Sequence, residues 1–330
     1  MTIAAWIASG LACGLFAAWG ALALHFQGPR NRVRRQLLIA VWLLFAFAVV
    51  VALRAYPLAA AALYLVAAVL LLAWWRGIRP ARDRDWADEV ARLATGRVEG
   101  DRVIVDHVRN FTWRTTTDYD VRWEQRSYDL NHLQSVDLIL SYWGRPGIAH
   151  TLVSFGFADG GQLVFSVEIR KQRGEAYSEI GGFFRQFEAS IIAADERDIV
   201  YLRTNVRGED CYLYRIHLGE DARRALLLAY VEEANRLAER PRFYNSLTNN
   251  CTTVVYRMLS RILRGLPLDV RLLLSGLLPT YIHRLGGLTP AHDPEELRER
   301  GRITRRAIEA GHVADFPQRI RRGVPGIDPR

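Results

Sequence analysis

Three nearly charge-free segments open the chain and constrain its fold more than any other feature of the sequence. They span residues 3–26, 37–53 and 57–75. Each is about long enough to cross the roughly 30 Å hydrocarbon core of a bilayer as an α-helix. The third ends in Trp74-Trp75-Arg76, a composition typical of the interfacial end of a membrane helix. The sequence therefore predicts a transmembrane region of three helices over residues 1–80.

Arginine gives a first indication of how these helices are oriented. The loop 30–35 carries four arginines, the second loop carries Arg54 alone, and residues 76–84 carry four more. Arginine-rich loops are retained on the cytoplasmic side of membranes. This count favours an amino terminus outside the cytoplasm and a cytoplasmic location for everything after residue 80.

Composition excludes several classes of site. Basic residues exceed acidic ones by 44 to 35, but Lys171 is the only lysine, and it does not end a glycine-rich loop as a P-loop nucleotide site requires. The three cysteines, Cys13, Cys211 and Cys251, are far apart, which favours neither a zinc cluster nor a disulfide framework. The histidines lack metal-ligand spacing. We expect no metal, no cofactor and, because no aromatic platform accompanies the arginines, no nucleic-acid partner.

The residues after 85 have the pattern of a globular α+β domain with a mostly antiparallel sheet. Runs rich in Val, Ile, Tyr and Phe predict strands at 102–107, 136–143, 148–157, 162–170, 198–204 and 211–218. Helices are predicted at 178–189, 221–239 and 252–263. The polar, arginine-rich residues 291–330 form a separate C-terminal tail, predicted to be a peripheral helix followed by a loose end.

Cys251 is the first candidate for chemistry. It follows Thr248-Asn249-Asn250 and precedes an apolar-periodic segment, so an Asn or Thr N-cap would place the thiol in the first turn of a helix. The helix dipole and the free N–H groups there stabilise a thiolate, the nucleophilic form of cysteine. The alternative is a small buried residue in a capping turn.

A predicted β-hairpin supplies a second pair of polar residues. The strands 148–157 and 162–170 flank Ala158-Asp159-Gly160, a three-residue loop with glycine where a left-handed conformation is needed. This register places His150 directly opposite Glu168 on one face, with Cβ atoms about 5 Å apart. A carboxylate in that position would orient an imidazole and fix its tautomer. The alternative is a cross-strand polar pair on a solvated face.

Several short motifs together resemble a known family. They are Ala149-His150-Thr151, Tyr244-Asn245, Asn250-Cys251-Thr252-Thr253, Arg109-Asn110-Phe111, Ser141-Tyr142-Trp143-Gly144 and Gly181-Gly182-Phe183-Phe184-Arg185. Over roughly residues 86–288 the chain is similar to the periplasmic domain of the Lnb-type lipoprotein N-acyltransferases. The order of His before Cys is shared more widely with permuted papain-like, NlpC/P60-related cysteine enzymes.

The resemblance implies a permuted papain-like catalytic domain over residues 85–290, with Cys251 as nucleophile and His150 as base. It implies transfer of an acyl chain from a phospholipid donor to a lipoprotein N-terminus or another amine acceptor. Such a domain lies on the periplasmic side of a bacterial inner membrane, against the arginine count, and we expect this orientation. Glu168 rests on the hairpin register alone.

Further roles follow from position. The Cys251 N–H at the helix start is the natural oxyanion donor, with Asn245 and Asn250 as candidate second donors and Tyr244 as a neighbouring substrate-binding residue. The apolar residues 266–288 could cover an acyl chain or form an ordinary core helix pair. Two other functions fit the same residues: a papain-like cell-wall peptidase or amidase, and a non-catalytic membrane sensor or assembly domain.

Overall fold

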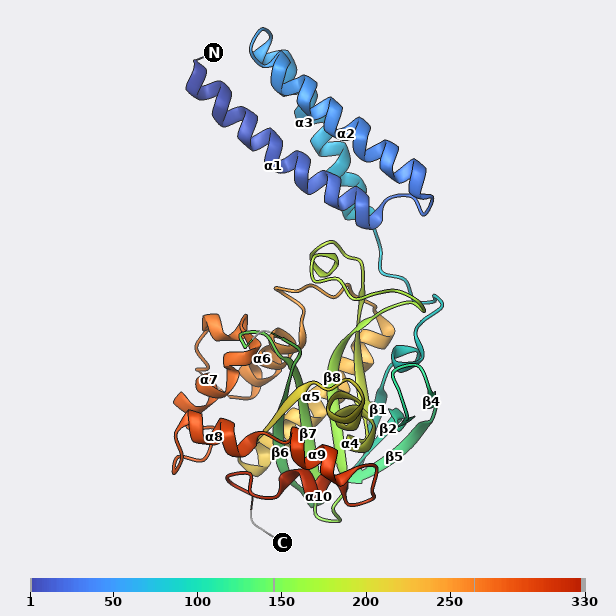
Figure 1. Cartoon of the computed structure of the whole chain (residues 1–330), viewed down its shortest axis with the longest axis vertical. Coiled ribbons are helices and arrows are strands. Elements are labelled where there is room, and N and C mark those ends of the chain that lie inside the picture. The colour runs from blue at the N-terminus through green and yellow to red at the C-terminus, as the bar shows by residue number, and fades with distance from the viewer. Residues whose placement is uncertain (1, 145, 264, 328–330) are drawn as a thin grey trace. The chain divides into compact units, whose positions relative to one another are not determined.

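The computed structural model describes residues 2–144, 146–263 and 265–327. The chain forms two compact units (Figure 1). The first combines residues 1–81 with residues 177–187, and the second combines residues 82–176 with residues 188–330. A segment from the middle of the sequence therefore packs with the N-terminal helices.

The first unit confirms the three predicted apolar helices. They are α1 (Ile3–Gln27), α2 (Arg32–Ala52) and α3 (Pro57–Gly77), each long and apolar enough to cross a membrane. Side-chain hydrogen bonds link them: the Trp42 indole donates to the Ala17 carbonyl at 2.9 Å, and the Tyr64 hydroxyl donates to the Cys13 carbonyl at 2.6 Å. Such bonds satisfy polar groups that lipid cannot. The helices therefore form a packed bundle.

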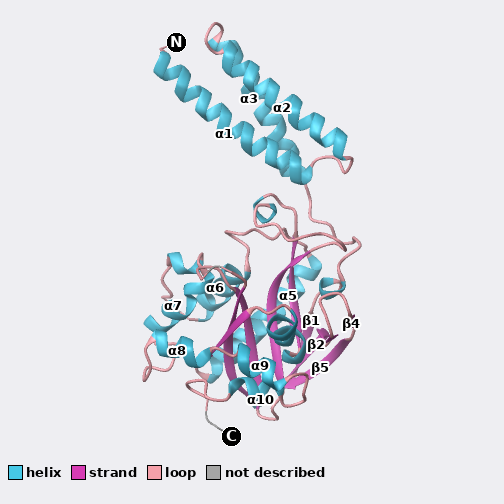
Figure 2. Cartoon of the chain, viewed as in Figure 1, coloured by secondary structure: helices cyan, strands magenta, loops and turns pink. Residues whose placement is uncertain are grey.

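The second unit is built on an eight-stranded sheet with the order β1-β2-β9-β8-β7-β6-β10, in which β5 pairs with β2. Figure 2 shows the sheet in magenta and the helices in cyan. All pairs are antiparallel except β2 with β9, so the predicted α+β class with a mostly antiparallel sheet is confirmed. The strands are β1 (Thr95–Glu99), β2 (Arg102–Arg109), β5 (Trp123–Asp129), β6 (Leu133–Tyr142), β7 (His150–Phe157), β8 (Gln162–Arg170), β9 (Glu188–Ala194) and β10 (Asp210–Ile216). The short strands β3 (Thr112–Trp113) and β4 (Tyr119–Asp120) form a separate two-stranded sheet.

Helices cover both faces of this sheet. On one face, α5 (Glu220–Glu239) and α6 (Cys251–Ile262) pack Tyr230 and Met258 against Phe155 and Phe165. On the other face, three helices pack against the alternate residues of the same strands, including Leu152: α4 (Glu196–Tyr201), α9 (Thr304–Ala310) and α10 (Phe316–Arg321). Side chains of a strand alternate between faces, so each strand contributes to both layers. The sheet is thus the centre of a three-layer domain.

Two of the predicted elements are wrong. Residues 198–204, expected as a strand, form α4 (Glu196–Tyr201) and the π-helix η4 (Leu202–Val206), because Asp195 caps the helix by accepting from the Arg197 amide. Residues 178–189, expected as a helix, form the short η3 (Gly181–Phe183) and the start of β9. Two consecutive glycines disfavour a helix there.

The C-terminal segment is ordered and packed. It forms α8 (Pro294–Gly301), α9 (Thr304–Ala310) and α10 (Phe316–Arg321), of which α9 and α10 lie against the sheet (Figure 1). Phe316 is fully buried, and the buried Arg321 guanidinium donates to Asp137 at 2.9 Å and to Glu196 at 2.6 Å. The expectation of a loose end is therefore wrong up to residue 327, and residues 328–330 lie outside the described range.

Candidate active site

The β7–β8 hairpin positions two of the predicted residues. Leu152 lies opposite Ser166 and Gly156 opposite Gln162, and Gly160 in the turn has φ +84°, so the predicted register is confirmed. Continued to the strand ends, this register brings His150 Nε2 to 3.0 Å from Glu168 Oε1. The pair is largely enclosed rather than solvated, with 12% of the His150 side chain and 19% of the Glu168 side chain exposed.

The start of α6 positions Cys251, the third of the predicted residues. Asn250 is the N-cap, and its Oδ1 accepts from the amides of Thr252 at 3.0 Å and Thr253 at 2.8 Å, while the Thr253 hydroxyl accepts from the Asn250 amide. This capping box fixes Cys251 as the first helical residue. Val254 and Met258 carry the helix into the core, so the thiol lies at the edge of the packed interior, 8% exposed.

The structure brings Cys251 and His150 together. The imidazole lies near enough to lower the pKa of the Cys251 thiol, and its Nε2 lies 2.7 Å from Ser166 Oγ and 3.0 Å from Glu168 Oε1. Because Nε2 faces these two β8 side chains, Nδ1 is the ring nitrogen left for the sulfur. The order sulfur, imidazole and carboxylate is that of a nucleophile, a base and an orienting group.

Electrostatics favour an ion pair at this dyad. Burial and the nearby Arg203 disfavour an imidazolium, but the Glu168 carboxylate and the bond to Cys251 outweigh them and raise the pKa of His150 to about 9. Burial likewise opposes a thiolate, but His150 and the Thr151 amide outweigh it and lower the pKa of Cys251. A raised pKa of the base and a lowered pKa of the thiol together favour the thiolate–imidazolium pair.

Three further residues at this site were not identified from the sequence. The Ser166 hydroxyl donates to Glu168 Oε1 at 2.8 Å, and Arg203 donates to the same oxygen at 2.8 Å. Through its other nitrogen Arg203 donates to Glu209 at 3.2 Å. Ser166 precedes Glu168 by two positions and could have been found by strand alternation. Arg203 lies in the segment mistaken for a strand, and no local signal marks it.

These partners hold Glu168 as an anion. Burial would raise its pKa, but the positive charges of His150 and Arg203 hold that pKa well below the ordinary value of 4.5. Arg203 is only 6% exposed and bridges the two carboxylates of Glu168 and Glu209. The Glu168 carboxylate is therefore fixed by a buried guanidinium.

The remaining predicted residues make structural contacts in the segment that leads to the candidate nucleophile or in the core that contains it. The Asn250 side chain is the α6 cap and also donates to the Ser246 carbonyl at 2.7 Å. Asn245 Oδ1 accepts from the amides of Leu247 and Thr248 at 3.0 and 2.9 Å, an Asx turn before the helix. Tyr244 packs against the core cluster that contains Cys251.

An exposed aliphatic segment is hydrogen-bonded to Ala149, the residue before His150. The Ser275 hydroxyl accepts from the Ala149 amide at 2.8 Å and donates to the Ala149 carbonyl at 2.6 Å. Around it, η5 (Val270–Leu272), η6 (Ser275–Leu277) and α7 (Leu278–Arg284) replace the expected helix pair. Some side chains here enter the core, but others are exposed, namely Leu268, Val270, Leu273, Leu274 and Leu277. We call residues 268–277 the leucine segment.

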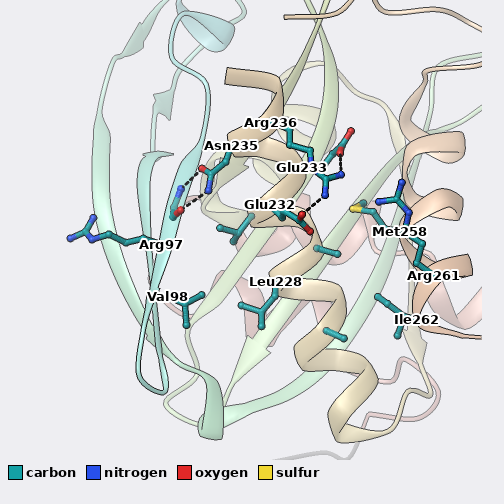
Figure 3. A pocket seen from close by; sticks show the side chains of 14 residues that line it. Arg97, Val98, Leu228, Glu232, Glu233, Asn235, Arg236, Met258, Arg261 and Ile262 are labelled. Atoms are coloured by element: carbon teal, nitrogen blue, oxygen red, sulfur yellow. Dashed lines mark hydrogen bonds and ion pairs between the residues drawn. The ribbon is translucent and has the colours of Figure 1, made fainter. Parts of the chain in front are cut away.

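A separate pocket of about 500 Å³ lies between β1, α5 and α6 (Figure 3). Leu228, Met258 and Ile262 supply apolar lining, and Asn235 bonds to the backbone of Gly96 at its edge. Met258 is about 10 Å along the helix axis from Cys251 at 1.5 Å per residue. The lining contains neither cysteine nor histidine. This pocket does not contain the candidate nucleophile.

The other thiol of the domain has the opposite environment. Cys211 is fully buried on β10, and burial raises its pKa to about 12. A thiol in that state is unreactive. Among the described residues, no three His, Cys, Asp or Glu side chains are grouped as metal ligands.

Comparison with known proteins adds one finding. Residues 119–276 match the family model of the Lnb N-terminal periplasmic domain. The resemblance drawn from the motifs is thus confirmed over this range, which includes His150, Glu168 and Cys251. No curated protein and no solved structure matches the chain. With its three apolar helices, the chain fits a membrane protein with a periplasmic domain.

Proposed function

We propose that this protein is a membrane-anchored cysteine acyltransferase that moves an acyl chain from a phospholipid to an amine acceptor, the N-terminus of a lipoprotein. The observation that carries the proposal is the group of side chains at the start of α6, in which His150 lowers the pKa of Cys251 and His150 Nε2 lies 3.0 Å from Glu168 Oε1. The family match supports the substrate class.

The first half of the reaction forms a thioester. His150 holds the proton of Cys251, and the thiolate attacks the ester carbonyl carbon of the phospholipid. The tetrahedral intermediate collapses as the carbon–oxygen bond to glycerol breaks, and His150 returns its proton to the leaving alkoxide. A lysophospholipid departs, and the acyl chain stays on sulfur. Glu168 stabilises the imidazole while it carries this proton.

The second half transfers the chain to nitrogen. An unprotonated amine attacks the thioester carbonyl, His150 accepts the proton that the amine loses, and the carbon–sulfur bond breaks. The products are an amide and the thiolate–imidazolium pair with which the cycle began. Water in place of the amine would release a fatty acid, so the acceptor decides between transfer and hydrolysis.

The oxyanion of both intermediates requires donors near the sulfur. The amides of Thr252 and Thr253 bond the Asn250 cap, which leaves the amide of Cys251 at the positive end of α6 for the oxyanion. Asn245 and Asn250 remain candidates for the second donor. Asn250 Nδ2 already donates to the Ser246 carbonyl, which makes the Cys251 amide better supported as a donor than Asn250.

A lipid donor is favoured over a soluble one by two apolar features. The three N-terminal helices hold the chain at a bilayer, which raises the local concentration of phospholipid. The exposed leucine segment is bonded to Ala149, next to His150, and offers aliphatic contact to a chain entering the site. A cell-wall peptidase would require neither feature.

Mass spectrometry of the purified chain after incubation with phospholipid tests the proposal. We expect the acyl mass on the peptide that contains Cys251, and its loss when an amine acceptor is added. Cys251→Ser should abolish turnover, whereas the matched control Cys211→Ser should retain it. A fully active Cys251→Ser variant, or an acyl mass on Cys211, would show the mechanism to be wrong. An unacylated Cys251 that cleaves a peptide would favour the peptidase.

A further inference from the structure

The loop that joins β8 to β9 carries the Gly-Gly-Phe-Phe-Arg motif, to which the proposed chemistry gives no role. Residues 177–187 belong to the compact unit of the three apolar helices rather than to the sheet domain. We call these residues the 177–187 loop. Its packing with α1 and α3 indicates what surrounds it.

Polar contacts fasten this loop to the helix ends. The Gln27 side chain, at the last residue of α1, donates to the carbonyls of Phe184 at 3.1 Å and Arg185 at 2.6 Å. The Arg185 guanidinium donates to the Trp75 carbonyl at 2.6 Å, in the last turn of α3. A cation at a helix C-terminus compensates the negative end of the dipole. Arg185 holds φ +57°, a conformation costly for a residue with a Cβ, so these contacts maintain a specific backbone shape.

Aromatic contacts reinforce the attachment. The Phe184 ring stacks on Phe26 with centroids 5.6 Å apart and meets Trp75 edge-on at 6.2 Å. The Arg185 guanidinium lies over the Trp75 ring at 4.7 Å. Phe26, Gln27 and Trp75 mark the same end of the bundle. The loop therefore lies at the level where the two apolar helices end, the level that aromatic residues occupy in membrane proteins.

The loop also presents apolar side chains that the protein does not cover. Ile180 is 54% exposed, Tyr177 50% and Phe183 42%, while Phe184 and Phe187 are packed. Large exposed apolar residues beside the ends of membrane helices are suited to the boundary between headgroups and acyl chains. Water would be an unfavourable environment for this set.

We propose that the 177–187 loop is a second membrane-binding element, which inserts Ile180 and Phe183 into the lipid interface at the Gln27–Trp75 end of the helices. Its partner is the bilayer surface. Since residues 171–176 connect the loop to β8, the strand that carries Glu168, insertion ties that strand to lipid at a point separate from the linker after α3. The inference rests on the three helices crossing a membrane and not on Cys251 being a nucleophile.

Depth measurement by spin labelling tests the insertion. The full chain, with Cys13→Ala, Cys211→Ser and Cys251→Ser as background, receives Ile180→Cys or Phe183→Cys, a nitroxide label, and reconstitution in phospholipid nanodiscs. Oxygen concentrates in lipid and a nickel chelate in water, so power saturation with each reports depth. We expect labels at both positions to be several-fold less accessible to nickel, relative to oxygen, than a label at the exposed Val121 of the sheet domain.

A label at Leu65, exposed midway along α3, gives the reference for a lipid-facing position. Labels at 180 and 183 that are as accessible to nickel as the one at Val121 would overturn the proposal. If the label disrupts the loop, a benzophenone amino acid replacing Phe183 should crosslink to phospholipid. Crosslinking to protein alone would identify a protein partner and refute insertion. Because the background lacks Cys251, neither readout depends on acyl transfer.

Discussion

Neutralising Glu168 tests whether the carboxylate sustains the ion pair at Cys251. The pKa of His150 is about 9 against an ordinary value of 6.5, although burial and Arg203 both act to lower it. At ~1.36 kcal/mol per pKa unit, this difference is about 3 kcal/mol, or roughly a factor of 300 in the protonation constant. The negative charge of Glu168 does most to raise the pKa of His150, and hydrogen bonding to Cys251 and Glu168 adds to it.

Glu168→Gln keeps the shape of the side chain but removes its charge, so the pKa of His150 should fall to about its ordinary value or below. The sign is fixed: a base with a raised pKa stays charged up to the raised value and loses its proton earlier when the pKa falls. At pH 8 the fraction of His150 that is protonated drops from about 90% with a pKa of about 9 to about 3% with a pKa of 6.5. The reactivity of Cys251 should therefore fall by roughly thirtyfold or more.

The assay is the rate of alkylation of Cys251 by iodoacetamide between pH 6 and pH 9, measured in the Cys13→Ala, Cys211→Ser background. The wild-type rate should reach its plateau below the ordinary cysteine pKa, and the Glu168→Gln rate should rise only at higher pH. His150→Ala removes the base itself, so the loss of turnover should be larger, about 10²–10⁴-fold. Glu99→Gln, an exposed acid on β1, is the matched control. An unchanged alkylation profile for Glu168→Gln would remove this residue from the site.

Two further predictions concern stability and topology. Arg203→Met leaves Glu168 and Glu209 buried without their guanidinium partner. It should lower the free energy of unfolding by about 3–5 kcal/mol at neutral pH, measured by chemical denaturation. Burial opposes ionisation of both carboxyls, but neighbouring positive charges lower both pKa values, so their stabilising contribution is present above about pH 4.5 and lost as the pH falls. The difference in the free energy of unfolding between wild type and Arg203→Met should therefore narrow toward pH 4. A difference independent of pH would contradict this account. For topology, alkaline phosphatase fused after Arg330 should be active, and an impermeant thiol reagent should reach Cys251 in cells with a permeabilised outer membrane. An inactive fusion with labelling only after lysis would favour the arginine count and exclude lipoprotein N-acylation.

The site could be anticipated where local sequence fixes geometry. Gly160 set the hairpin turn, the turn set the register, and the register placed His150 beside Glu168. Asn250 marked the start of α6 and thus the position of the thiol. Each inference needed only a few neighbouring residues. The contact between Cys251 and His150 joins distant segments and followed only from the family resemblance.

What could not be anticipated depends on partners far apart in the chain. Arg203 is an internal helical residue whose role appears only when Glu168 and Glu209 meet it. Arg321 looks like part of a solvated basic tail, yet it pairs with Asp137 and Glu196 in the core. The apolar run of β9, residues 191–194, is too short to distinguish a strand from a helix segment by periodicity.

The composition of the first unit bears on how the sheet domain can be produced by itself. Cutting the chain after residue 81 removes α1 and α3 but leaves the 177–187 loop attached to β8 and β9. Phe184 would then lose the rings of Phe26 and Trp75, and an already exposed apolar loop would gain a further uncovered aromatic. Such a fragment is expected to self-associate or retain detergent. Replacing residues 177–187 by a short glycine-serine connection gives a fragment whose solubility reflects the sheet domain alone.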